Sequence, residues 1–108
     1  MAIDKSNTFS YTLSILKETT NVEWDEQKNL RNQTIHGIGF DEAALVFGDP
    51  FRIEIFDSTH SLDENRYITI GMVRKVLFVV YTMRGDTHRI ISARLANAEE
   101  RKAYYGND

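Results

Sequence analysis

The sequence has no cysteine, a single proline and no long run of apolar residues. Without cysteine there is no disulfide framework, no zinc-thiolate site and no cysteine nucleophile, and nothing indicates an oxidising compartment. The first twenty residues lack the basic start, apolar core and small-residue cleavage site of a signal peptide, and no later stretch is apolar enough to span a bilayer. These absences predict a cytoplasmic protein with no membrane attachment.

A surplus of positive charge is also missing, because 13 Lys and Arg residues stand against 16 Asp and Glu residues and the net charge is -3. A typical nucleic-acid binder carries excess positive charge that attracts phosphate. Any contact with RNA or DNA must therefore come from a local basic patch.

The 108 residues, 42% of them hydrophobic, suffice for one compact domain with a small core. The alternation of apolar and polar residues in Phe9–Ile15 favours a half-buried strand, although the same residues could continue past Leu16 as a short helix. We divide the chain into an N-terminal arm of unknown role, residues 1–21, and a core domain, residues 22–108. The arm is compatible with an upstream start, a vector remnant or an added strand that pairs with another chain.

The first helix is predicted from the signals at its two ends. Asp25 can cap its N-terminus, and the helix ends at about His36 because Gly37 can supply the left-handed conformation that closes a helix. A short extended segment, residues 22–24, precedes it. Few of its residues are apolar, so we expect it on the surface.

A second helix is predicted from a hydrophobic staple and an N-cap. Phe40 and Leu45 flank Asp41 at the spacing of a staple, which predicts a helix over residues 42–47. Pro50 ends this helical region.

Beyond the proline the apolar residues recur at every second position, and β-branched and aromatic residues are frequent. Short connections make the later strands an antiparallel meander, with a tight hairpin at Gly85 and Asp86. Asn97 and Glu100 have capping-box spacing and begin a short C-terminal helix. We therefore predict an α+β protein with helices against a four-stranded, mainly antiparallel sheet. The predicted strands are residues 51–56, 66–73, 76–83 and 88–94.

Positive charge is concentrated in the predicted sheet, whereas the loop from Asp57 to Glu64 is acidic. Strict alternation places Arg89 and Arg94 on opposite faces of their strand, so one of them is expected to pair structurally. Clustered guanidinium groups can bind a phosphate and stabilise a phosphodiester transition state. Composition alone favours the alternative, in which these side chains pair with acidic residues on the sheet surface. The positive residues of the sheet region include Arg66, Arg74, Lys75, Arg84, Arg89 and Arg94.

Two histidines could take part in chemistry. His36 lies at the end of the first helix, where the carbonyl ends favour imidazolium, so it could donate a proton, bind phosphate or only cap the helix. His60 lies among acidic residues, but the spacing of a metal site is absent, and we interpret it as part of a solvated loop. No metal and no cofactor are predicted.

Five short motifs occur in a fixed order between residues 22 and 105. They are E-W-D, H-G-x-x-F-D-E-A, V-F-x-D-P, R-I-I-S-A-R and E-R-x-x-Y. This ordered combination resembles the BrnT family of type II toxins, although each motif alone is a weak signal. The resemblance implies a RelE-like microbial ribonuclease fold with two N-terminal helices, four strands and a C-terminal helix. It also implies metal-independent RNA cleavage that inhibits translation.

The resemblance further implies partners and site residues. A BrnA-like antitoxin with a ribbon-helix-helix domain would neutralise the toxin in a heterotetramer that contacts DNA only through the antitoxin. Ile35 stands where the family commonly has lysine, so one basic residue is absent. The alternative function is an antitoxin-binding protein with weak or no catalysis that acts in operon autoregulation. The catalytic residues implied are His36, Arg66, Arg84 and Arg94, and the substrate-binding residues are Lys28, Asn32 and Tyr81.

Overall fold

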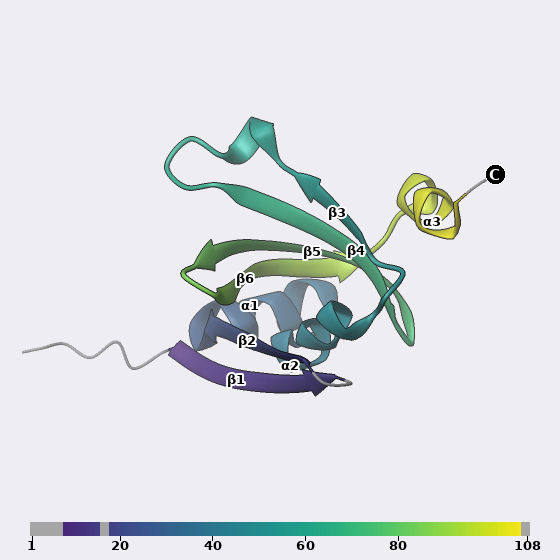
Figure 1. The fold of residues 1–108 in the computed structure, drawn as a ribbon. Helices are drawn as coiled ribbons and strands as arrows, with labels where there is room; N and C mark the ends of the chain where they lie inside the picture. The colour runs from purple at the N-terminus through teal and green to yellow at the C-terminus, as the bar shows by residue number, and fades with distance from the viewer. Residues whose placement is uncertain (1–7, 16–17, 107–108) are drawn as a thin grey trace, which may run out of the picture.

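The computed structural model describes residues 8–15 and 18–106, which form a six-stranded sheet, three α-helices and two short 3-10 helices (Figure 1). The sheet order is β1-β2-β6-β5-β4-β3, and every neighbouring pair is antiparallel except β2 and β6. The strands are β1 (Thr8–Ile15), β2 (Glu18–Asp25), β3 (Ile53–Phe56), β4 (Arg66–Val73), β5 (Lys75–Arg84) and β6 (Thr87–Leu95). The helices are α1 (Glu26–His36), α2 (Phe40–Ala43), α3 (Ala98–Tyr105) and the 3-10 helices η1 (Ala44–Gly48) and η2 (Ser58–His60).

The predicted α+β class and the mainly antiparallel sheet are confirmed, but the prediction of two N-terminal helices and four strands is wrong. A hairpin of β1 and β2 precedes the helices, with the register running from Thr8 opposite Asp25 to Ile15 opposite Glu18. The first residues of β2 are polar. They join the sheet through backbone hydrogen bonds, so the sequence has no alternation of apolar residues there that would predict a strand. The proposed division of the chain at residue 21 falls inside β2.

The ends of α1 lie where the sequence predicts them. The Asp25 carboxylate accepts hydrogen bonds from the backbone N–H groups of Gln27 at 2.8 Å and Lys28 at 3.4 Å. Gly37 closes the helix with φ 73°, in the left-handed region. Both signals act within one turn of the chain, so no tertiary contact is needed to recognise them.

Two buried asparagines, and no buried apolar residue, dock α1, Asn32 on the sheet and Asn29 on α2. The Asn32 amide donates to the carbonyls of Ile38 at 2.9 Å and Ala93 at 2.8 Å, and its oxygen accepts from the Ala93 N–H at 3.2 Å. The oxygen of Asn29 accepts from the N–H of Phe40 at 2.7 Å. Hydrogen bonds to the backbone thus replace an apolar stripe.

The second helix differs from its prediction over residues 42–47. It begins at Phe40 after an N-cap at Gly39, and it continues as η1. Phe40 is fully buried, with its ring edge-on to Trp24 at 6.3 Å, whereas Leu45 is 46% exposed. The predicted staple therefore does not form, because the core takes Phe40 into the helix itself.

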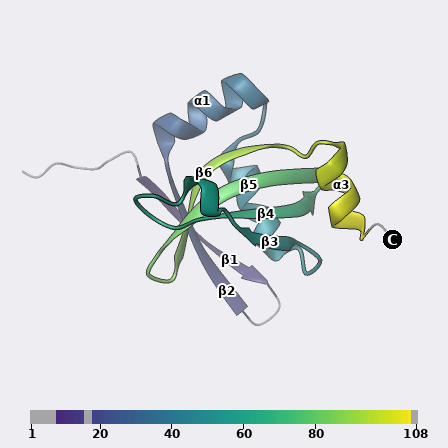
Figure 2. The ribbon, with the colours of Figure 1, turned by 90° about the horizontal axis from the view of Figure 1, so that it is seen from above.

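The two faces of the sheet have different surroundings. Alternate residues of β5 point to opposite sides, and α2 and η1 pack on the side of Leu77, Val79 and Tyr81, which we call the covered face. We call the other side, with Phe78, Val80 and Thr82, the open face. Only α3 lies against the open face among the described elements, and it does so at one end, where its Tyr104 packs on a small second cluster. Figure 2 shows α1 beside one face and α3 at the end of the strands.

A β-bulge interrupts the pairing of β5 and β6. Val80 lies opposite Ser92 and Tyr81 lies opposite Ile90, so that Ile91 is an extra residue. The extra residue shifts the alternation of β6 by one position. Ile90 and Ala93 are consequently both buried on the covered face, although they are three residues apart.

The bulge overturns the prediction that Arg89 and Arg94 lie on opposite faces. Arg89 lies opposite Thr82 and Arg94 lies opposite Phe78. Both partners belong to the open face, so the two arginines share it.

Candidate functional site

Four arginines from three strands lie on the open face. Arg66 and Arg89 are both cross-strand partners of Thr82, Arg84 follows Thr82 by two residues on β5, and Arg94 lies further along β6. Three of the catalytic residues implied by the resemblance, Arg66, Arg84 and Arg94, therefore share one face. His36 is not among them.

Arg89 and Arg94 are both engaged in close ion pairs. Arg89 Nη1 lies 2.7 Å from Glu23 Oε2, and both side chains are less than one fifth exposed. The Arg94 guanidinium donates to both oxygens of Glu100 at 2.8 and 2.9 Å and lies 3.8 Å from the centre of the Phe78 ring. This pairing with Arg94 holds the pKa of Glu100 below its usual value. Arg94 thereby ties α3 to the sheet, and a phosphate would have to compete with Glu100 for it.

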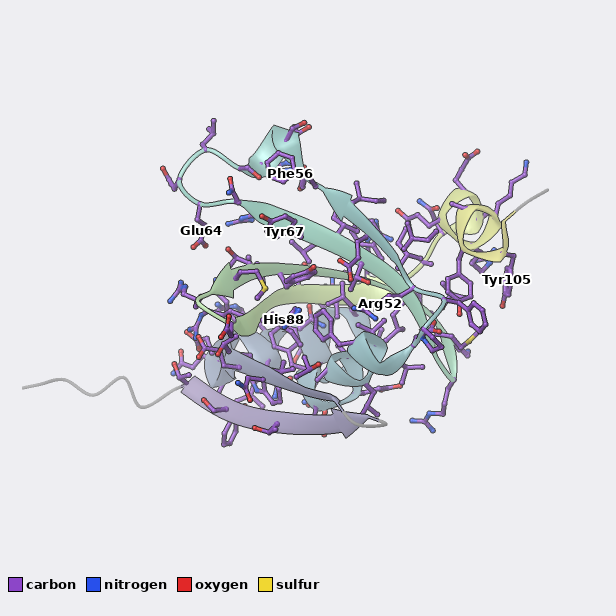
Figure 3. The ribbon with its side chains drawn as sticks, viewed as in Figure 1. Arg52, Phe56, Glu64, Tyr67, His88 and Tyr105 are labelled. Atoms are coloured by element: carbon purple, nitrogen blue, oxygen red, sulfur yellow. The ribbon has the colours of Figure 1, made fainter. Side chains whose placement is uncertain are left out.

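A cavity of about 300 Å³, the loop-side cavity, opens where β4 begins, beside the β3–β4 loop. His60, Glu64 and Arg66 line it together with Thr59, Leu62 and Asp63. Arg84 Nη2 lies 3.7 Å from Glu64 Oε1, which brings Arg84 to its edge. In Figure 3, Glu64 points from the loop toward the β5–β6 turn. Arg66 has no ion pair among the described residues.

Asp57 holds His60 at this cavity. The ring Nδ1 of His60 lies 3.0 Å from Asp57 Oδ2, and the carboxylate also accepts from the backbone N–H of His60 at 3.3 Å. The N–H of Asp57 donates to the carbonyl of Arg66 at 2.8 Å, so the pair is tied to β4. The His60 side chain is 68% exposed, and with Nδ1 facing Asp57 its Nε2 is left to meet a ligand.

The sequence-based interpretation of His60 as a solvated loop residue therefore missed its setting. The residue is exposed, as predicted, but it lies with Arg66 at one cavity. The spacing of Asp57 and His60, three residues apart after a strand, was the available signal.

His36 and Lys28 lie on α1 and are exposed. α1 contacts the covered face through Asn32 and Ala93. The sheet therefore separates both residues from the arginines of the open face. The expected convergence of His36 with those arginines is not present, because it depended on which face α1 packs against.

Asn32 and Tyr81 are buried, with 6% of each residue exposed. Both N–H donors and the oxygen of the buried Asn32 side chain bond backbone groups, which leaves no free donor for a substrate. Tyr81 donates its hydroxyl to Glu54 at 2.6 Å and stacks on Tyr67 with ring centres 5.6 Å apart. Burial and this bond raise the pKa of Tyr81 above its usual value. The predicted substrate-binding roles of both residues conflict with this packing.

His88 completes an aromatic cluster on the covered face that sequence reasoning did not consider. Its ring lies 4.3 Å from the ring of Phe47 and 5.2 Å from that of Tyr81, measured between centres. Its Nδ1 is buried and has no hydrogen-bond partner, and burial lowers the pKa of the imidazole. The neutral form is thus favoured. Figure 3 shows His88 between the strands and η1, away from Glu64.

Among the described residues, no three His, Asp or Glu side chains gather as a metal site would require. Across the same part of the chain, none of the helices has the length and apolar character needed to cross a membrane.

A family model described as "Ribonuclease toxin, BrnT, of type II toxin-antitoxin system" matches residues 24–100. The chain belongs to the BrnT family of ribonuclease toxins. The match begins at Trp24, so β1 and most of β2 of this BrnT-family chain precede it.

A crystal structure of the Brucella abortus ribonuclease toxin BrnT has the same fold, with a TM-score of 0.54 and 23% sequence identity. The superposition covers 68% of this chain and 92% of that chain. No curated protein matches the chain.

Most motif residues of the BrnT family serve the fold in this chain. Asp25 caps α1, Gly37 closes it, Phe40 fills the core and Asp49 bonds three separate segments. These motif residues therefore account for caps and packing in the fold and do not by themselves locate the chemistry.

Proposed function

We propose that this BrnT-family toxin is a metal-independent endoribonuclease whose reaction takes place at the loop-side cavity. The observation that carries the proposal is the presence of His60 and Arg66 in one cavity, with Arg84 at its edge. An imidazole and two guanidinium groups can supply proton transfer and charge stabilisation without a metal.

The reaction is an attack of the ribose 2′-hydroxyl on the adjacent phosphorus. The Nε2 of neutral His60 accepts the 2′-hydroxyl proton while the new P–O bond forms. The bond to the 5′-oxygen breaks, and that oxygen takes up a proton from solvent or from the imidazolium. The products are a 2′,3′-cyclic phosphate and a 5′-hydroxyl. Asp57 positions the imidazole through Nδ1, and Arg66 and Arg84 bind the phosphate oxygens.

Arg94 has a supporting role in this proposal, since its pair with Glu100 docks α3. His36 and Lys28 have no part in the chemistry, because they lie on the helix that packs against the covered face.

The partner of a type II toxin is an antitoxin. We propose a BrnA-like antitoxin, a heterotetrameric complex and action in the cytoplasm, where the RNA target is found. An acidic antitoxin segment over Arg66 and Arg84 would block the cavity by charge pairing.

A second candidate function is binding to the antitoxin with little catalysis. It is supported by the ion pairs of Arg89 and Arg94, which occupy two of the four open-face arginines. Only Arg66 and Arg84 are then left to bind the phosphate of a substrate, and Arg84 lies 3.7 Å from Glu64. In that case the role of the chain would be repression of its operon through the antitoxin.

The test is cleavage of a labelled single-stranded RNA by the purified chain in EDTA. The wild-type chain should cleave, and His60→Ala and Arg66→Ala should each lose about 100-fold or more, the usual contribution of acid-base and charge-stabilising groups. His36→Ala is the matched histidine control and should cleave within about twofold of wild type.

Product analysis should find the 2′,3′-cyclic phosphate. If a folded wild-type chain does not cleave, the binding function takes precedence. If the chain cleaves and His60→Ala has full activity, the reaction takes place elsewhere.

A further inference from the structure

A basic groove of about 370 Å³ lies at the opposite end of β4 from the loop-side cavity. The β4–β5 hairpin forms one wall and α3 forms the other. Its cationic and aromatic walls are Arg74, Lys75, Arg101 and Tyr105, and its apolar floor includes Met72 and Val76.

The positive charges of the groove are poorly neutralised. Arg74 Nη2 lies 3.6 Å from Glu42 Oε2, but the Arg74 side chain is 83% exposed, so this pair is weak. Lys75 has no ion pair among the described residues. Arg101 donates to the carbonyl of Ala96 at 3.0 Å, which leaves its charge uncompensated. Three cations thus meet at one groove in a chain with a net charge of -3.

The backbone at Arg74 is strained. Arg74 has φ 66°, and among the described residues it is the only one other than glycine with a positive φ. It joins β4 to β5 alone, since Val73 pairs with Lys75. Glycine or asparagine would adopt this conformation with less strain, so an arginine here retains a positive charge at an energetic cost.

Tyr105 offers an aromatic surface beside these cations. It is 64% exposed, and its ring meets the edge of Tyr104 at 5.2 Å and 77°. Tyr104 is anchored by the bond from its hydroxyl to Asp49, and α3 is also held by Arg94. Figure 3 shows Tyr105 at the side of α3. A fixed helix therefore presents an exposed ring next to three positive charges.

We propose that this groove is a second RNA-binding subsite, in which Arg74, Lys75 and Arg101 bind backbone phosphates and one unpaired base stacks on Tyr105. Cations beside an exposed aromatic ring are the combination that binds single-stranded nucleic acid without sequence preference. The inference rests on the proposed function, because it extends the same RNA along the open face.

The two sites lie at opposite ends of β4. Arg94 donates to the carbonyl of Leu95, which lines the groove, and β4 runs from Arg66 at one site to Val73 beside the other. A strand of this length extends about 25 Å, so only an RNA of several nucleotides reaches both sites.

The experiment measures binding of a 2′-O-methyl RNA of about 20 nucleotides, which cannot form the cyclic phosphate, by fluorescence anisotropy. The double variant Arg74→Asn with Lys75→Gln keeps a residue that tolerates the turn and removes two charges. It should bind about tenfold more weakly, and Tyr105→Leu should also lose about tenfold. Lys102→Gln is the matched control, since this α3 lysine does not line the groove, and it should bind within about twofold of wild type.

Two further measurements separate this inference from the proposed function. Wild-type cleavage of an RNA of about four nucleotides, too short to span both sites, tests the loop-side cavity alone. Binding of a polyglutamate peptide tests whether the groove takes an acidic protein segment instead.

Weaker binding by both groove variants with an intact control supports the inference. Unchanged RNA binding by both variants, while the wild-type chain cleaves the short RNA, overturns the inference and leaves the proposed function standing. Groove variants that bind RNA as the wild type does but bind the polyglutamate peptide more weakly also overturn the inference. A wild-type chain that neither binds nor cleaves RNA overturns both proposals.

Discussion

Asp49 shows how much of this fold depends on one carboxylate. Its oxygens accept hydrogen bonds from the Tyr104 hydroxyl at 2.6 Å, the Met72 N–H at 2.7 Å and the Phe51 N–H at 2.9 Å. Burial alone would raise the pKa of Asp49, but these bonds outweigh it and hold the pKa below the usual value. Burial and the same carboxylate raise the pKa of Tyr104 to about 12. The residue thus joins α3, β4 and the segment after Pro50.

Asp49→Asn should lower the free energy of unfolding at neutral pH by about 1–3 kcal/mol, because a charged acceptor of three bonds is lost. A lowered carboxylate pKa stabilises the folded state above the unfolded-state value of 3.8, and this stabilisation is lost as the pH falls through the folded-state value. The wild-type chain should therefore lose more stability than the variant between neutral and acid pH.

Urea unfolding at several pH values between about 7 and 3 measures both effects. Glu100 also has a lowered pKa, but it is present in both proteins and cancels in the difference. If the free energies of unfolding of wild type and variant fall equally between neutral and acid pH, the lowered pKa of Asp49 is contradicted.

At the scale of elements, the close approach of β4 to η1 depends on Gly71. A Cβ built on Gly71 would lie 2.6 Å from Val46 Cγ2 and 3.1 Å from Arg52 Cβ. Both neighbours are held by the core or the backbone and cannot rotate away. A side chain at residue 71 would therefore push η1, and the segment carrying Asp49, off the sheet.

Gly71→Ala should destabilise the fold by about 1–3 kcal/mol through overpacking. Gly39→Ala is the matched control, since its Cβ would meet the ends of the Asp41 and Gln33 side chains, at 2.6 and 2.9 Å, and these can rotate. Thermal unfolding should show a clearly lower Tm for Gly71→Ala alone. Equal Tm values for the two variants would mean that η1 can move without cost.

Over the whole molecule, the positive charges are concentrated at a few places although the net charge is negative. The chain is acidic overall, yet cationic side chains lie at both ends of β4: Arg66 beside the acidic β3–β4 loop, and Arg74 and Lys75 at the hairpin. RNA binding must then depend on a few local phosphate contacts, not on general attraction.

The salt dependence of RNA binding should reflect this small number of phosphate contacts. Each phosphate contact on a single strand contributes about -0.7 to the slope of log K against log salt, so five cations give a slope no steeper than about -3.5. Removal of Arg74 and Lys75 should make the slope shallower by about 1.4. Anisotropy titrations over a range of salt concentrations measure it, and a flat slope for the wild-type chain would exclude phosphate binding at both sites.

The sequence by itself determined the features that depend on neighbouring residues. The caps of α1 at Asp25 and Gly37, the capping box of α3 and the hairpin turn at Gly85 and Asp86 were predictable because their signals lie within one turn. The bounds of β4 were predicted to the residue, since period-two alternation marks a strand with one buried face. The ordered motifs determined the family.

Only the tertiary structure decided which chemical groups meet. The extra residue Ile91 is invisible until β6 pairs with β5, and it brings Arg89 and Arg94 to one face. The choice of face for α1 removes His36 from the arginines, and the β3–β4 loop brings His60 to Arg66. Backbone pairing between distant segments sets the register of a strand and the face to which each side chain points. A shift of one residue moves every side chain beyond it to the opposite face.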